Sequence, residues 1–254
     1  MLRSQPACRA AAHRAGFAPS ARARGSGRMD PGRGRSRAVG GRSPGDGQAA
    51  ERPTGDVLMT GFILAGGYST RMGRDKALLA AGSQTLIEVV IRRLRSRADR
   101  VIAIGNAHNI RQLRALPLDD VLLDLAPGYG PLMGVLTGLM QTKTPMNCFV
   151  SCDMPWVQGP VLDRLTGACQ GDGRVVASLH PYEGIQPLPI VCHVSACRTV
   201  GALLDRGARS LHSLLSEPGS RLVHIEEPRL WRSFINVNTI EDYEAFRHEY
   251  ADAP

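Results

Sequence analysis

Short apolar runs alternate along the chain with stretches in which apolar residues recur at helical spacing, beginning at Gly61. This alternation is typical of βαβ units, in which helices connect parallel strands. It predicts an α/β protein with a Rossmann-like three-layer fold and a mainly parallel sheet. Strands are predicted over 61–65, 100–105, 120–124 and 147–151, with weaker signals over 175–178 and 188–192. Helices are predicted over 85–97, 131–141, 159–168, 195–204 and 210–216.

The C-terminal part of the chain carries a separate signal. Residues 234–238 are expected to form a short extended piece. Thr239 is followed three residues later by Asp242, and this capping-box spacing predicts the start of a final helix. A chain of 254 residues is long enough for one large α/β domain, which is a simpler interpretation than two small domains.

A segment of different composition precedes the folded pattern. Residues 1–56 are rich in Arg, Ala, Gly, Ser and Pro and poor in Leu, Ile and Val, so they bury too little apolar surface to offset the entropy of ordering. We expect a disordered leader over 1–58 and a folded domain over 59–254. Three interpretations of the leader stay open: an organelle transit peptide, an Arg/Gly-rich tail that binds nucleic acid, or a start codon placed too far upstream. Met59, just before the first predicted strand, favours the third.

The formal net charge of +8 is unevenly distributed along the chain. Residues 1–58 hold 11 of the 31 basic and 4 of the 23 acidic residues, which leaves 20 basic and 19 acidic residues in the folded part. A nearly neutral domain gives no electrostatic reason for binding nucleic acid. No apolar run approaches the roughly 18 residues of a membrane-spanning helix. We therefore expect a soluble protein that binds no membrane and whose folded part does not bind nucleic acid.

The six cysteines form neither a C-x-x-C pair nor a Cys/His cluster with zinc-finger spacing. Free cysteine is among the residue types that are most often buried. We interpret all six as buried structural thiols of a reduced, cytoplasmic protein: Cys8, Cys148, Cys152, Cys169, Cys192 and Cys197.

The loop after the first predicted strand carries the strongest chemical signal. Gly66 and Gly67 let the backbone approach a ligand and direct successive N–H groups at an anion. Ser69 adds a hydroxyl donor, and Arg71 and Lys76 add the positive charge that a triphosphate requires. The spacing matches neither Walker A nor G-x-G-x-x-G. Taken alone, the segment could also be an ordinary glycine-rich connection with a solvated Arg and Lys.

Polar residues also follow two later strands. Asn106 ends the second predicted strand, where open parallel sheets bind ligands, and is placed for a base or a ribose; as an alternative it is a turn residue. Asp153 follows the apolar strand 147–151, which places it beside the loop after the first strand if the sheet is doubly wound. It is the candidate metal ligand, because magnesium prefers hard oxygen ligands and often takes one or two carboxylates. The alternative for Asp153 is a structural cap of the following helix.

The segment from Leu64 to Lys76 is similar to L-A-G-G-x-S-x-R-M-G-x-D-K, the signature of the molybdenum cofactor guanylyltransferases, or MobA family. Residues 124–134 resemble the family's D-x-x-x-x-x-G-P-L-x-G segment, and residues 152–155 share its C-D-x-P string. The resemblance implies that Asp153 binds Mg²⁺. It leaves one alternative for Asp124, which could merely bond the amides of its own turn. The residues to which it assigns nucleotide binding are Leu64, Ala65, Gly66, Lys76, Asn106, Asp124 and Asp153.

Two segments of the second half resemble the acceptor side of the same family. Residues 186–190 are similar to its Q-P-L-x-A-like segment, and residues 234–239 to its N-x-N-T segment, with Ile240 in place of the usual Pro. The resemblance implies that Asn236 and Asn238 read a pterin ring or its phosphate. Stabilisation of a strand-to-helix turn by the two asparagines is an equally good interpretation. Arg209 could serve the same pocket.

The implied reaction is attack by the terminal phosphate of molybdopterin on the α-phosphorus of GTP, with release of pyrophosphate. A phosphate monoester has a second pKa of about 6 and is already nucleophilic at neutral pH, so no general base is required. The catalytic groups implied are Lys76, Arg71 and Asp153 with Mg²⁺, which position and neutralise the phosphates. Transient contacts with molybdoenzymes or cofactor chaperones are also expected.

Two rival functions stay open. A related transferase could use CTP or another small phosphorylated acceptor, although Gly66-Gly67 favours GTP because the cytidylyl relatives tend to have Ala-Gly. A non-catalytic nucleotide-binding adaptor, tethered to nucleic acid by the leader, is the alternative from another class. Turnover that depends on Lys76 and Asp153 would distinguish an enzyme from such an adaptor.

Overall fold

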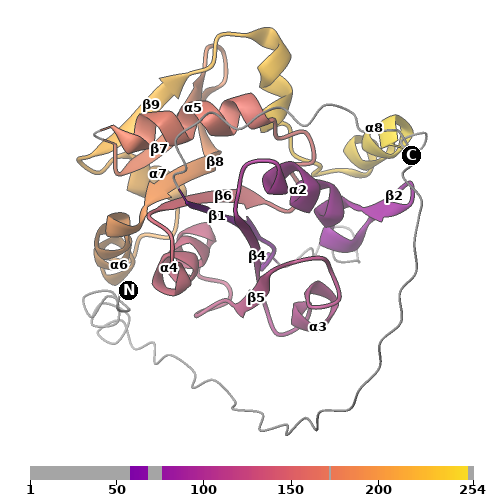
Figure 1. The fold of residues 1–254 in the computed structure, drawn as a ribbon, viewed down its shortest axis with the longest axis horizontal. Helices are drawn as coiled ribbons and strands as arrows, with labels where there is room; N and C mark the ends of the chain where they lie inside the picture. The colour runs from indigo at the N-terminus through magenta and orange to yellow at the C-terminus, as the bar shows by residue number, and fades with distance from the viewer. Residues whose placement is uncertain (1–57, 68–75, 172, 251–254) are drawn as a thin grey trace, which may run out of the picture.

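A seven-stranded sheet organises the computed structural model, which describes residues 58–67, 76–171 and 173–250 (Figure 1). The strand order is β5-β4-β1-β6-β8-β7-β9. The strands are β1 (Met59–Leu64), β4 (Arg100–Gly105), β5 (Asp120–Leu123), β6 (Met146–Ser151), β7 (Val175–His180), β8 (Gly184–His193) and β9 (Ser220–His224). A separate two-stranded ribbon pairs β2 (Ala80–Ala81) with β3 (Gln84–Thr85).

Most strand pairs are parallel, which confirms the predicted sheet type. Strand β1 lies between β4 and β6, parallel to both, and β4 is parallel to β5. Strand β8 is the exception, since it is antiparallel to β6 and to β7. Only three residues, 181–183, connect β7 to β8, and a connection this short can join antiparallel strands but not parallel ones.

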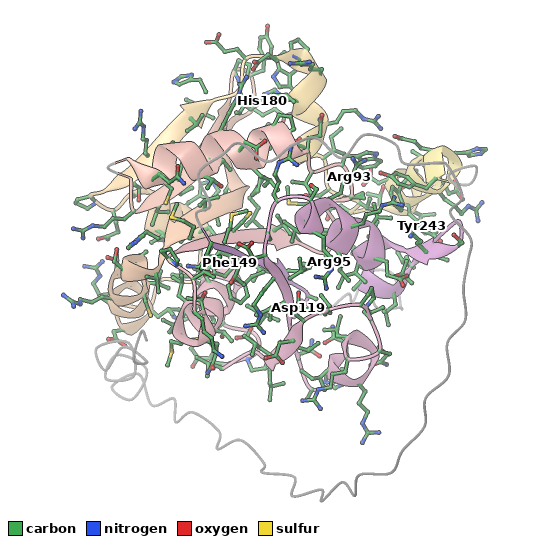
Figure 2. All side chains as sticks on the ribbon, viewed as in Figure 1. Arg93, Arg95, Asp119, Phe149, His180 and Tyr243 are labelled. Carbon is green, nitrogen blue, oxygen red and sulfur yellow. The ribbon has the colours of Figure 1, made fainter. Side chains whose placement is uncertain are left out.

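Helices cover both faces of the sheet, as the three-layer prediction requires (Figure 1). One face packs against α2 and α5, and the other packs against α4, α6 and α7. Side chains alternate between the two faces along each strand: Ile63 faces the first layer, whereas Phe62 faces the second and stacks on Phe149, labelled in Figure 2, with ring centroids 4.9 Å apart. The helices are α2 (Leu86–Arg95), α3 (Ile110–Leu113), α4 (Pro131–Gln141), α5 (Gly159–Gln170), α6 (Cys197–Asp205), α7 (Leu211–Leu215) and α8 (Ile240–Tyr250), with 3-10 turns η1 (Lys76–Leu78), η2 (Val194–Ala196) and η3 (Pro228–Phe234).

The C-terminal helix forms a small core of its own against α2. Phe246 and Tyr250 of α8 pack with Leu86, Val89 and other apolar side chains. The predicted capping box is confirmed, because the Asp242 amide donates to Thr239 Oγ1 at 3.1 Å and the Thr239 amide donates to Asp242 Oδ2 at 2.9 Å. The predicted extended piece over 234–238 is shorter than expected, since Phe234 ends η3 and only 235–238 follow without a regular element.

The strand register brings four loops to one edge of the sheet. Leu64 at the end of β1 pairs with Ile104 of β4 on one side and with Ser151 of β6 on the other. Gly105, at the end of β4, pairs with Leu123 of β5. The loops that leave β1, β4, β5 and β6 therefore meet at the carboxyl edge, where open α/β sheets bind ligands.

Three of the cysteines sit within the layers as free, buried thiols: Cys148, Cys169 and Cys192. Burial raises the pKa of Cys148 to about 12 and that of Cys169 to about 11. These thiols stay protonated at neutral pH and are poor nucleophiles, which agrees with the structural role predicted for them. The prediction is wrong for two others, since Cys197 is disulfide-bonded and Cys152 is only partly buried. In the described ranges, no helix has the length and apolar character needed to cross a bilayer.

Candidate functional site

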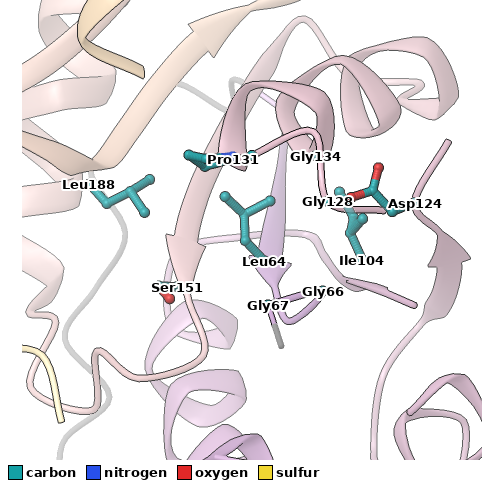
Figure 3. A pocket seen from close by; sticks show the side chains of 11 residues that line it. Leu64, Gly66, Gly67, Ile104, Asp124, Gly128, Pro131, Gly134, Ser151 and Leu188 are labelled. Atoms are coloured by element: carbon teal, nitrogen blue, oxygen red, sulfur yellow. The ribbon is translucent and has the colours of Figure 1, made fainter. Parts of the chain in front are cut away.

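A cavity of about 300 Å³ opens at the carboxyl edge, beside the end of β1 (Figure 3). Glycines and main chain form much of its wall, which allows a ligand to lie against the backbone. Three residues predicted to bind a nucleotide line it: Leu64, Gly66 and Asp124. The other lining residues are Gly67, Ile104, Gly128, Gly130, Pro131, Gly134, Ser151 and Leu188.

Two of these glycines allow a close approach between the wall elements. A Cβ on Gly134 of α4 would lie 2.7 Å from Leu64 Cδ2, so a larger residue there would push α4 away from the end of β1. Gly130 has a φ of +77°, and a Cβ there would lie 2.8 Å from the carbonyl oxygen of Arg209. The G-P-L-x-G segment can therefore form this wall only because its two glycines carry no side chain.

Asn106 and a second asparagine, Asn109, donate hydrogen bonds to the main chain of the turn after β1. Asn106 Nδ2 donates to the carbonyl of Gly66 at 3.0 Å, and Asn109 Nδ2 donates to that of Ala65 at 2.7 Å. Both side chains are buried, and Asn106 Oδ1 accepts the amide of His108 at 2.8 Å. The side chain of Asn106 therefore acts within its turn, as the alternative interpretation held, and direct contact with a nucleotide stays a prediction. Sequence reasoning missed Asn109, although an Asn three residues after Asn106 was a visible signal.

Replacing Asn109 by Ala is expected to lower the free energy of unfolding by about 1–3 kcal/mol, because the carbonyl of Ala65 and the amide of Asn106 lose a buried partner. At about 2–4 °C per kcal/mol for a domain of this size, Tm should fall measurably in calorimetry. Arg111→Ala, an exposed change in the short helix α3 that follows Asn109, is the control. An Asn109→Ala protein with the same Tm as the control variant would contradict this role.

Asp124 reaches the cavity from the end of β5. Its Oδ2 would lie 3.6 Å from a Cβ placed on Gly66, and Thr137 Oγ1 donates to its Oδ1 at 3.1 Å. Burial raises the pKa of Asp124, while hydrogen bonds from Thr137 and from the backbone of Ala126 and Leu125 oppose that rise. Both interpretations therefore have support: the carboxylate lines the cavity and also bonds amides of its own turn.

Three residues from distant parts of the chain meet next to the cavity-forming strands. Lys76 Nζ, on η1, donates to Asn238 Oδ1 at 3.0 Å and lies 3.9 Å from Asp153 Oδ2. Lys76 and Asn238 are 162 positions apart in the sequence. The side chains of Lys76 and Asp153 are only 18% and 16% exposed. The predicted neighbourhood of Lys76 and Asp153 is confirmed, whereas the place of Asn238 beside them was not foreseen.

The other oxygen of Asp153 is buried and has no hydrogen-bond partner among the residues described. Leaving a buried acceptor without a partner costs about 1–3 kcal/mol, and a divalent cation would satisfy it. Asn238 Oδ1 and Asp153 Oδ2 both face the Lys76 ammonium, so two hard oxygen atoms lie near this cationic group. Within the described ranges no three His, Cys, Asp or Glu side chains gather. A carboxylate and an amide oxygen suit a hard cation such as magnesium, which commonly takes one or two carboxylates and completes its coordination with waters and substrate phosphates.

The remaining predicted residues lie around this site or outside the described chain. Arg71 and Ser69 fall outside the described residues. Asn236 is exposed in the segment after η3. Arg209 stacks over Tyr129, with its guanidinium carbon 4.2 Å from the ring centroid, and its carbonyl accepts the amide of Leu132 at 3.3 Å. Arg209 thus supports the cavity wall near the start of α4.

Comparison with known proteins shows relatives along most of the chain. Residues 61–221 match the model of the MobA-like NTP transferase domain. The chain is 32% identical over 186 residues to the molybdenum cofactor guanylyltransferase of Vibrio atlanticus (strain LGP32), covering 72% of this chain and 93% of that one. It is 33% identical over 187 residues to the one of Serratia proteamaculans (strain 568), covering 72% and 91%. The crystal structure of molybdopterin-guanine dinucleotide biosynthesis protein A from Archaeoglobus fulgidus shares the fold, with a TM-score of 0.63 at 20% identity over 75% of this chain and 97% of that one.

Proposed function

The chain belongs to the MobA-like NTP transferase family, and from this premise we propose that it transfers GMP from GTP to molybdopterin, releases pyrophosphate and forms the guanine dinucleotide cofactor. The observation that carries the proposal is the convergence of Lys76, Asp153 and Asn238 beside the glycine-walled cavity at the end of β1. The names of the relatives support guanosine and molybdopterin as the substrates.

The nucleotide is proposed to lie across the end of β1. Its base and ribose occupy the cavity between Leu64 and the start of α4, where about 300 Å³ suits a small molecule. Its phosphates follow the turn at Gly66 and Gly67 toward Lys76 and Asp153. Asp124 offers its carboxylate to the nucleoside at the cavity wall.

Magnesium is the proposed cofactor. Asp153 would hold it through its buried Oδ1, which has no partner among the described residues, and Asn238 Oδ1, which accepts from Lys76, is proposed as a second ligand. When bound, the ion neutralises charge on the phosphates around the α-phosphorus. Lys76 places its ammonium within reach of the same phosphates and stabilises the charge that develops on the leaving pyrophosphate. Arg71 is proposed to add a second positive charge to the loop.

The chemical step needs positioning more than proton transfer. An oxygen of the molybdopterin phosphate forms a bond to the α-phosphorus of GTP, the bond from that phosphorus to the β-phosphate oxygen breaks, and pyrophosphate leaves. The attacking phosphate has a second pKa of about 6, so it is already a dianion at neutral pH and gives up no proton. Asn236, exposed after η3, is proposed to contact the acceptor. Asn238 was predicted for the same role, and its bond with Lys76 is the reason for proposing it as a cation ligand here.

Purified protein incubated with Mg²⁺, molybdopterin and either GTP or CTP tests the proposal. Pyrophosphate release with GTP is the expected result, and consumption of CTP alone would establish the cytidylyl alternative. GTP binding without turnover would indicate the adaptor. Thermal stabilisation by GTP, CTP and ATP, measured in parallel, separates base preference from catalysis because it needs no acceptor.

The leader is proposed to play no part in this reaction. The family match begins at residue 61, and the cavity and cation residues all follow it. Deleting residues 1–58 is therefore expected to leave kcat and KM for GTP unchanged in a steady-state assay with molybdopterin. A substantial loss of turnover in the shortened protein would show that the leader contributes to the site. The proposed place of action is the cytoplasm, with transient transfer of the product to molybdoenzymes or cofactor chaperones.

A further inference from the structure

Asp242, in the first turn of α8, is bonded to the segment that carries Asn238. Its Oδ2 accepts the amide of Asn238 at 2.9 Å and the amide of Thr239 at 2.9 Å. The side chain of the same residue, Asn238, accepts a hydrogen bond at its Oδ1 from Lys76 Nζ at 3.0 Å. Asp242 therefore acts on the site through the main chain of Asn238, and its carboxylate also interacts electrostatically with Lys76.

The segment before α8 has no regular structure, so individual bonds determine where Asn238 lies. On its N-terminal side, Val237 is fully buried and its amide donates to the carbonyl of Asp153 at 2.9 Å. On its C-terminal side, the bond to Asp242 fixes the main chain of Asn238 itself. The side chain of Asn238 is exposed and gains no fixation from packing.

Helix α8, which carries Asp242, is fixed by packing and by a hydrogen bond. Phe246 is fully buried in the small core that α8 shares with α2. Tyr243, labelled in Figure 2, donates from its hydroxyl to the carbonyl of Ala80 at 2.7 Å. Strand β2, which contains Ala80, follows directly after the turn that carries Lys76. The first turn of α8 therefore contacts both the Asn238 segment and the segment after Lys76.

We propose that Asp242 is a positioning residue, which holds the main chain of Asn238 so that Asn238 Oδ1 stays beside Lys76 and Asp153, where the divalent cation would bind. The proposal rests on the proposed function only in that the site binds a divalent cation together with a nucleotide. It gives the C-terminal helix, which lies beyond the matched domain at residues 61–221, a role in metal binding. Partners one step removed from a metal ligand typically change metal affinity by about 10- to 100-fold when they are removed.

A role limited to helix capping is the competing explanation, and the chain offers a matched control for it. Thr239 Oγ1 accepts the amide of Asp242 and forms the other half of the capping box. Thr239→Ala removes this cap but leaves the bond between Asp242 and the Asn238 amide. Both variants should lose similar stability, whereas only Asp242→Ala should change metal dependence.

The test is calorimetric titration of the full chain with GTP at increasing Mg²⁺, and in EDTA, which requires no turnover. Asp242→Ala is expected to raise the Mg²⁺ concentration for half-maximal GTP binding by about tenfold, with unchanged GTP affinity in EDTA. Asp242→Asn, whose amide oxygen accepts the same two N–H groups, should behave like the wild type. Should Asp242→Ala fail to fold, Asp242→Ser replaces it, because a hydroxyl is too short to reach both amides.

A double variant decides whether the effect passes through Asn238. Adding Asp242→Ala to Asn238→Ala should raise the Mg²⁺ requirement no further, since residues that act through one contact are not additive. Equal Mg²⁺ dependence in the Asp242→Ala and Thr239→Ala proteins, or additive effects in the double variant, would overturn the proposal while the proposed function stands. Wild-type GTP binding that ignores Mg²⁺ would overturn the metal role and this inference together.

Discussion

Asp153→Ala is expected to lower kcat/KM for GTP by about 1,000-fold or more while the protein without ligands keeps or gains thermal stability. The loss follows from the metal ion, whose charge stabilisation is worth several kcal/mol at about 1.4 kcal/mol per tenfold change in rate. The stability gain follows from the buried Asp153 oxygen that lacks a partner, since removing such a group removes a cost of about 1–3 kcal/mol.

A loss of activity without a loss of stability can be distinguished from unfolding of the variant. The Val237 amide bonds the main-chain carbonyl of Asp153, so truncating the side chain leaves that contact in place. Asp205→Ala, at the exposed end of α6, is the control and should retain turnover. Steady-state kinetics over a range of Mg²⁺ concentrations and a melting curve in EDTA measure both effects. Wild-type turnover in Asp153→Ala, or a clear drop in its Tm, would contradict the assignment.

Lys76→Ala is expected to reduce kcat/KM for GTP by about 100-fold, the range found when one preorganised group that stabilises developing charge is removed. The ammonium lies 3.0 Å from Asn238 Oδ1 and 3.9 Å from Asp153 Oδ2, next to the turn along which the phosphates are proposed to lie. Thermal stabilisation by GTP should weaken in parallel, because the same charge binds the ground-state triphosphate.

The chain contains one other lysine, Lys143, which is exposed after α4 and supplies the matched control. Lys143→Ala removes the same charge far along the sequence from the loop and should leave both kcat and KM unchanged. Lys76→Arg keeps the charge but replaces a compact ammonium by a planar fork, so it should recover only part of the activity. Equal losses in the two alanine variants would mean that net charge, rather than the position of Lys76, matters.

Apolar patterns were sufficient to predict the central strands and most helices. The strand predicted over 61–65 is β1, and the helix predicted over 131–141 matches α4 at both ends. Strand β9 was missed because its residues are half-buried or exposed and produce no apolar run. The β2–β3 ribbon has two residues per strand, which is too short for any periodic pattern.

The sequence predicted the individual site residues better than their arrangement. Lys76 and Asp153 follow strands that the predicted parallel sheet placed next to each other, and the structure brings them together. Asn238 could not be placed in this way, because its position depends on how α8 packs against α2 and on bonds from Asp242. The spacing of Asn109 from Asn106 could have indicated a shared turn, but its bond to the main-chain carbonyl of Ala65 in another loop could not be predicted from residue types.

A crystal structure of the protein with GTP and Mg²⁺ tests the central claim most directly. We expect the guanosine in the cavity between Leu64 and the start of α4, the phosphates along the turn at Gly66, and the metal on Asp153 with Lys76 beside the triphosphate. An empty cavity, with the nucleotide bound elsewhere and Asp153 contacting no metal, would contradict the account.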